Sequence, residues 1–238
     1  ARLSVRRRKA ALYTGYRGRG ALGSPDSATF GADETKREEN QCKIIQFCRM
    51  HIKKENKIKY YQTVTLKNGK TCIIRHAEAA DAAEVRRNFL QTHAETDNLL
   101  TYPDESKMTV ESEADFLQKT ADSENAIELC AILDGKLVGT AGIEPVGTRE
   151  KLRHRAEFGI SIEKAYWGQG IGRVLTAACI ALAKKAGYAQ LELQVVCDNT
   201  AAVALYKSIG FIEYGRNPRG FRSRVTGWQP LSLMQLEL

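Results

Sequence analysis

Y-W-G-Q-G-I-G-R, residues 166–173, is the segment around which this sequence can be organised. It places three glycines within five positions, directly after an apolar, strand-like run at 158–162. Apolar residues then recur with the spacing of one helix face, at Ile171, Val174, Leu175, Ala178 and Leu182. Gly187 is expected to end this helix. A glycine-rich turn that opens a helix exposes backbone N–H groups at the positive end of the helix dipole, so it predicts a phosphate or pyrophosphate site.

A G-x-G-x-G motif alone is also typical of an ordinary tight turn between a strand and a helix. Two better-known phosphate-binding motifs do not match it. A P-loop would continue with Gly-Lys-Ser/Thr, whereas this chain has Gly172-Arg173-Val174. A dinucleotide-binding motif counted from Gly168 would need a small residue where Arg173 stands. The turn therefore needs support from elsewhere in the sequence.

A second block downstream gives that support. L-E-L-Q-V-V at 191–196 is typical of a strand, and C-D-N-T-A-A-V-A-L-Y-K-S-I-G-F follows at 197–211. Asn199 is a good N-cap for a helix that Gly210 would end. W-G-Q-G-I-G-R followed by N-x-x-A-x-x-L-Y-x-x-x-G-F resembles the GNAT superfamily of acetyl-CoA-dependent N-acetyltransferases. The resemblance covers roughly residues 71–238 and is specific for the fold and the cofactor, but it says little about the substrate.

The resemblance implies an α/β (α+β) fold, in which helices flank a mixed, mostly antiparallel central sheet. Residues 61–238 would form this GNAT domain, and their own patterns predict the order β-α-α-β-β-β-α-β-α-β-β. Besides the elements above, the patterns predict helices at 77–90 and 109–120 and strands at 70–76, 126–133, 137–145, 157–162, 211–214 and 231–238, with a leading strand at 63–65 as an option outside this order. Asp134-Gly135 is a hairpin turn signal.

Composition narrows the class of protein. The chain has 238 residues, of which 43% are hydrophobic and 27% charged, and no apolar run is long enough to span a membrane. Six cysteines are scattered without a C-x-x-C motif, and the four histidines lack ligand spacing. We therefore expect a cytoplasmic protein with reduced thiols and no metal site.

The net charge of +8 is concentrated in residues 1–60, which hold fifteen Lys/Arg and six Asp/Glu, whereas 61–238 hold twenty-one and twenty-two. We expect residues 1–60 to be a basic extension that is disordered or non-native, with a short helix near 42–52 as an option. The alternatives are a solvated tail, a segment foreign to the protein, an arm that binds RNA or the ribosome, and an organelle targeting peptide. Nucleic acid binding is expected only through this segment.

The resemblance also implies which residues bind the cofactor. Backbone amides of the turn would hold the pyrophosphate of coenzyme A; these are Gly168, Gln169, Gly170, Ile171, Gly172 and Arg173. Backbone groups of Ile160, Ser161 and Ile162 would pair with the pantetheine like an added strand, and an N–H near Ile162 would face the acetyl oxygen. Asn199 would contact the cofactor as well as cap its helix. Trp167 stands where the family usually has Gln or Arg, so a polar contact there is not expected.

Tyr206 matches the family's general acid, which protonates the departing thiolate, although a core tyrosine is the alternative. The general base stays open. Gln194 occupies the position at which the ribosomal-protein branch often has a glutamate, and it cannot accept a proton. Glu157, acting through water, is favoured, with Glu192 or no dedicated base as alternatives. An ion pair with the arginines at 153 and 155 is the other interpretation of Glu157.

These expectations describe an enzyme that transfers an acetyl group from acetyl-CoA to a primary amine by direct attack in a ternary complex. The amine would be a protein N-terminus, a lysine or a small amine. The alternatives are a module that binds acetyl-CoA without turnover and an RNA- or ribosome-associated protein. Loops at 92–107, 149–155 and 215–228 are expected to set specificity. The four arginines of the last loop suit a solvated loop near the coenzyme A phosphates, which is preferred, or an acidic substrate or RNA surface. A homodimer through the last strands is a further option.

Overall fold

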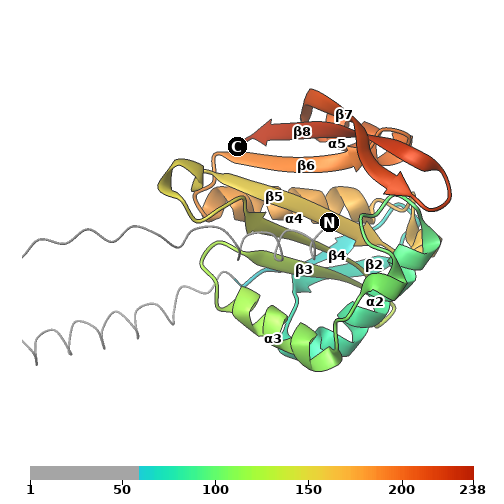
Figure 1. Cartoon of the computed structure of the whole chain (residues 1–238). Coiled ribbons are helices and arrows are strands. Elements are labelled where there is room, and N and C mark those ends of the chain that lie inside the picture. The colour runs from blue at the N-terminus through green and yellow to red at the C-terminus, as the bar shows by residue number, and fades with distance from the viewer. Residues whose placement is uncertain (1–58) are drawn as a thin grey trace, which may run out of the picture. The chain divides into compact units, whose positions relative to one another are not determined.

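Residues 59–238 are the part of the chain that the structure, a computed structural model, describes (Figure 1). The expected basic extension, apart from its last two residues, and the optional helix at 42–52 lie outside these described residues. No helix within 59–238 is long and apolar enough to cross a membrane.

An eight-stranded sheet forms the centre of the described region, in the order β1-β2-β3-β4-β5-β6-β8-β7. All neighbouring strands are antiparallel except β5 and β6, which are parallel, so the predicted mixed and mostly antiparallel sheet is confirmed. The strands are β1 (Tyr61–Thr65), β2 (Thr71–His76), β3 (Ile127–Leu133), β4 (Lys136–Pro145), β5 (Arg155–Ile162), β6 (Gln190–Val196), β7 (Ile212–Ser223) and β8 (Gly227–Glu237).

Helices cover both faces of this sheet (Figure 1). In the described residues they are α2 (Ala82–Glu95), α3 (Val110–Ala121), α4 (Ile171–Lys185) and α5 (Thr200–Ile209). The main core lies on the α4 side, where fully buried Leu175 and Cys179 pack with apolar residues of β3 to β6. A smaller cluster that includes Val85, Leu117 and Cys130 lies under α2 and α3.

The sheet splits between β5 and β6. Their pairing covers three positions only and ends at Glu157↔Glu192, whereas β4 stays paired with β5 as far as Ile162. The sheet therefore consists of a first arm, β1 to β5, and a second arm, β6, β8 and β7, which separate beyond Glu157 (Figure 1). One edge of the C-terminal half of β5 faces this opening.

The predicted bounds were wrong in two parts of the chain. Helix α2 begins and ends five residues later than expected, because residues 79–81 form a 3-10 turn in which the Asp81 carboxylate accepts from the N–H of Glu78 and pairs with Arg75. The predicted loop at 215–228 is mostly strand, since β7 and β8 form a long hairpin. Its proline and glycine lie where the register shifts, between Asn217 and Phe221, and such irregular stretches tolerate residues that break regular pairing.

Candidate functional site

The glycine turn has the backbone that the sequence predicts. Gly168 and Gly170 have φ angles of 74° and 97°, which L-residues with side chains rarely adopt. Gly170 is the N-cap of α4, so the N–H groups of the first helical residues, Ile171 to Arg173, point out of the helix start. Gly172 has a different role: a Cβ there would lie 3.2 Å from Cδ2 of Leu205, so glycine lets α4 pack closely on α5.

The side chains of the turn bind neighbouring protein groups. The indole N–H of Trp167 donates to the carbonyl oxygen of Ile162 at 2.7 Å, and Arg173 donates to the Ser208 hydroxyl on α5 at 2.7 Å. Gln169 accepts from the Asn68 amide at 2.7 Å. The backbone amides are therefore the groups that the turn offers to an anion. The contact with Asn68 was missed in the sequence, because it joins residues 101 positions apart.

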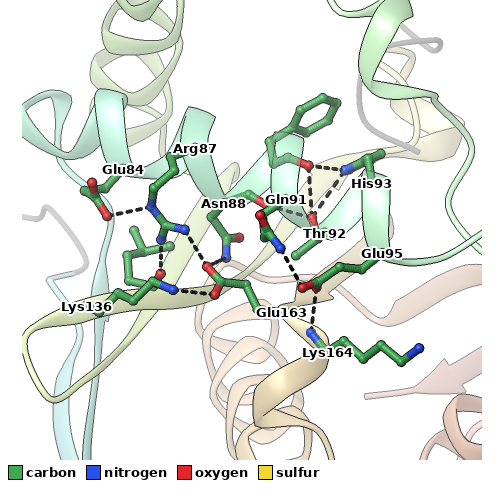
Figure 2. Close-up of polar contacts among 12 residues, drawn as sticks. Glu84, Arg87, Asn88, Gln91, Thr92, His93, Glu95, Lys136, Glu163 and Lys164 are labelled. Carbon is green, nitrogen blue, oxygen red and sulfur yellow. Dashed lines mark hydrogen bonds and ion pairs between the residues drawn. The ribbon is translucent and has the colours of Figure 1, made fainter.

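A buried carboxylate fixes the junction between β5 and this turn (Figure 2). Glu163 is 3% exposed and accepts from Arg87 at 2.7 Å, Lys136 at 2.7 Å and Asn88 at 3.1 Å. Burial raises the pKa of Glu163, but the hydrogen bonds from Lys136, Arg87 and Asn88 outweigh it and hold the pKa below its ordinary value. The end of β5 is thus tied both to α2 and to the start of β4.

Glu163→Gln is expected to lower the free energy of unfolding by about 2 kcal/mol at pH 7, because charge-assisted bonds to Arg87 and Lys136 are lost. The folded-state pKa of Glu163 is depressed, so its stabilising contribution is present at neutral pH and is lost as pH falls through that pKa. Urea unfolding between pH 7 and pH 3 should show the difference between the two proteins shrinking below about pH 4.5. A difference independent of pH would contradict this account.

The register of β5 separates backbone groups that face the opening from those that do not. Val146 donates to the carbonyl oxygen of Arg155 at 3.1 Å and Glu163 donates to that of Val138 at 3.0 Å, so odd-numbered residues of β5 bond to β4. Because bonding direction alternates along a strand, Ile160 and Ile162 face the opening. Ser161 therefore drops out of the predicted backbone contacts, since its N–H and C=O groups face β4.

Tyr206 and Asn199 lie on α5, beside the second arm. Asn199 is the N-cap of α5, and its side chain accepts from the N–H of Ala202 at 3.2 Å, so the predicted cap is confirmed. Tyr206 is 7% exposed and packs edge-to-face on Phe158 of β5, with ring centroids 6.2 Å apart. Burial raises the pKa of Tyr206, which keeps its phenol protonated at neutral pH. The tyrosine is thus part of the core and also reaches the first arm.

The two candidate bases are neighbours across the split in the sheet. Glu157 and Glu192 are paired positions of β5 and β6, and Glu144 of β4 pairs with Glu157 on its other side, so all three share one face. Arg155 donates to both carboxylate oxygens of Glu192, to Oε2 at 2.8 Å. The side-chain amide of Gln190 donates to Oε1 of Glu192 at 2.9 Å. Arg155 thus pairs with Glu192, one of the two candidate bases.

Metal chemistry has no visible basis in the described region. Among residues 59–238, no group of three or more His, Cys, Asp or Glu side chains is placed to hold a metal ion. Cys72, Cys130, Cys179 and Cys197 are free thiols. The other two cysteines lie outside the described residues.

A glycine turn at a helix start, beside a strand whose edge opens into a split sheet, is an arrangement shared with known proteins. The model of the acetyltransferase (GNAT) family matches residues 89–211, more than half of the chain. The chain belongs to the GNAT family. Acetyl-CoA is the co-substrate of this family, and the chain is accordingly an N-acetyltransferase.

Similar proteins within the GNAT family act on different acceptors. The L-amino acid N-acetyltransferase AaaT of Escherichia coli is 29% identical over 140 residues, which is 58% of this chain and 82% of that protein. The N-alpha-acetyltransferase RimI of Mycobacterium tuberculosis is 39% identical over 88 residues, 37% of this chain and 53% of that protein. Both names describe N-acetyltransferases, but the amine that is acetylated differs.

Solved structures agree with the fold. A GNAT-family acetyltransferase from Streptococcus pneumoniae superposes with a TM-score of 0.68 at 34% identity, covering 70% of this chain and 99% of that one. A putative acetyltransferase from Salmonella typhimurium, solved with its cofactor acetyl-CoA, has a TM-score of 0.62 at 21% identity, covering 70% and 94%.

Proposed function

We propose that this GNAT enzyme transfers the acetyl group directly to a primary amine within a ternary complex, at the opening between the two arms. The observation that carries the proposal is the placement of two groups on opposite sides of β5. Glu157 and Phe158 are consecutive in the strand, so their side chains point to opposite faces of the sheet. Tyr206 packs on Phe158. A proton acceptor and a proton donor therefore flank the opening from opposite faces.

The residues at the opening fit acetyl-CoA in three ways. The amides of Ile171 to Arg173 suit the pyrophosphate. The open edge of β5, with Ile160 and Ile162, suits an extended pantetheine. Asn199 lies at the start of α5 on the other side of the opening. The three contacts come from β5, the start of α4 and the start of α5, which all border the opening.

When bound, acetyl-CoA supplies a thioester whose carbonyl carbon bonds to the amine nitrogen as the C–S bond breaks. The N–H of Ile162 stabilises negative charge on the carbonyl oxygen. Glu157 receives, through a water, the proton that leaves the amine. The Tyr206 hydroxyl gives its proton to the departing sulfur and regains one from solvent.

Titration with acetyl-CoA, followed by thiol release against L-amino acids, small amines and peptides with free or blocked N-termini, tests this function. Saturable binding with release on one class of acceptor supports the proposal and identifies the amine. Binding without release on any acceptor would favour a module that binds the cofactor without turnover. Absence of binding would contradict the assignment of the glycine turn.

Glu157→Gln is expected to lower kcat/KM about 30-fold at pH 7, the size of effect typical of a general base. The loss should shrink as pH rises above about 8, because an α-amine then loses its proton without help. The pH profile of kcat/KM between pH 6 and pH 10 measures both features. Glu144→Gln is the matched control, since Glu144 is the neighbouring carboxylate in the same row, and it should stay within about threefold of the unmodified enzyme. Equal profiles for the two variants would exclude Glu157 as the base.

A further inference from the structure

The two arms of the sheet are connected a second time, at their open end, by the last residues of α2. On the first arm, Oε2 of Glu95 accepts from the backbone N–H of Lys164 at 2.7 Å, directly after β5 (Figure 2). The other oxygen of Glu95 accepts from Gln91 at 2.7 Å, which fixes the carboxylate on α2. Glu95 therefore ties the end of α2 to the strand that faces the opening.

Two residues later, Asp97 makes the corresponding contacts with the second arm. Its Oδ2 accepts from the hydroxyl of Ser223, from Thr226 at 3.0 Å and from the side-chain amide of Gln229 at 3.1 Å. The Gln229 amide also donates to the backbone carbonyl of Asp97 at 3.1 Å. Oδ1 accepts from Tyr102 at 3.2 Å. Ser223 and Gln229 are buried, so the hairpin end is held by shielded hydrogen bonds.

Residues 95–97 thus connect the two arms, and we call them the arm bridge. The bridge lies at the open end of the sheet, away from Glu157 and Glu192, where β5 and β6 are last paired. At the closed end, β5 and β6 share only three paired positions. So short a ladder by itself restrains the angle between the two arms weakly, because a small rotation at the hinge moves the distant ends by a larger amount. The shared core around Phe158 and Phe211 adds restraint near the hinge, and the arm bridge adds it at the open end. The predicted loops at 92–107 and 215–228, placed apart in the sequence, meet in this bridge.

We propose that Glu95 and Asp97 are positioning residues that set the separation of the two arms, and thereby the distance between the open edge of β5 and Tyr206. The inference rests on the proposed function, because the first arm carries Ile162 and Glu157, whereas Tyr206 lies on α5, which joins β6 to β7 of the second arm. Reaction at the opening needs groups from both arms in register, and errors near 1 Å in such geometry reduce rates strongly.

A second contact between loop and hairpin provides a matched control. Arg224 donates to Asp104 at 2.9 Å, but the two side chains are 55% and 65% exposed. An exposed ion pair contributes little to structure, so Asp104→Asn should leave kcat within about twofold. The bridge predicts a large difference between this variant and Asp97→Ala, although both changes remove a carboxylate from the same loop.

The test is a double-mutant cycle. Asp97→Ala and Glu95→Ala are each expected to lower kcat about tenfold with little change in the KM for the amine. The double variant should be no slower than either single variant, because each change cuts the same bridge. Asp97→Asn keeps one acceptor oxygen, so it should restore part of the rate. Unchanged kcat in Asp97→Ala, or losses that multiply in the double variant, would overturn the proposal.

Hydrogen exchange separates failure of this inference from failure of the proposed function. Cutting the bridge at Asp97 should raise amide exchange at Gly159 and Ser161, whose N–H groups bond to β4 in the first arm, whereas Asp104→Asn should not. This readout needs no turnover. A chain that acetylates no amine would refute the proposed function, and exchange at Gly159 and Ser161 would still decide the bridge: unchanged protection in Asp97→Ala overturns it. Thermal unfolding of each variant identifies one that fails to fold, in which case Asp97→Asn replaces Asp97→Ala.

Discussion

Tyr206→Phe is expected to lower kcat about 100-fold while the Kd for acetyl-CoA changes less than about twofold, because the substitution removes only the proton donor. The ring stays in place against Phe158 and Phe211, so packing is kept. Burial keeps the hydroxyl protonated, and a protonated phenol beside the departing sulfur can donate where bulk water is excluded. Steady-state thiol release and isothermal titration with acetyl-CoA measure the two quantities.

Tyr188→Phe is the matched control for this prediction. Tyr188 is 5% exposed, and its hydroxyl donates to the carbonyl oxygen of Asn125 at 2.8 Å, at the other end of α4 from the glycine turn. Its loss should cost about 1 kcal/mol of stability and leave kcat unchanged. If Tyr206→Phe behaves like Tyr188→Phe, Tyr206 is a core residue and the general acid lies elsewhere.

Gly170→Ala is expected to raise the Kd for acetyl-CoA at least about tenfold. At φ 97° an alanine is strained by about 1–2 kcal/mol, and relief of that strain turns the amides of residues 171–173 away from their present direction. Space is not the cause, since the nearest atom to an added Cβ is Cγ of Lys67 at 3.9 Å. The Kd follows from titration, and the amides can be followed directly in an NMR titration with acetyl-CoA.

Gly187→Ala is the matched control, because it introduces similar backbone strain away from the glycine turn. Gly187 follows the other end of α4 with a φ of 82° and has no atom within 4 Å of an added Cβ, so the cost in stability should be similar. The Kd for acetyl-CoA should stay within about twofold, because the start of α4 is unaffected. Equal Kd values for the two variants would show that the turn does not bind the cofactor.

Local features were predicted well from the sequence. The positive φ angles of Gly168 and Gly170, the Asn199 cap and the Asp134-Gly135 turn all depend on residues within a few positions of one another. Helical and strand periodicity depends on local spacing too, and it gave the order of the elements. The start of α2 was wrong because a local turn, in which Asp81 binds Glu78 and Arg75, precedes the helix, and the length of β7 was wrong because it depends on pairing with β8.

The sequence by itself therefore determined the fold class, the glycine turn and the helix caps, because glycine φ preferences and cap hydrogen bonds are settled within one turn of chain. The tertiary structure alone decided which backbone groups of β5 face the opening, that Arg155 pairs with Glu192, and that Asp97 joins residues 126 to 132 positions away. The split in the sheet, on which the site depends, follows from where β5 and β6 stop pairing. That point depends on two strands that α4 separates in the sequence, so no local pattern encodes it.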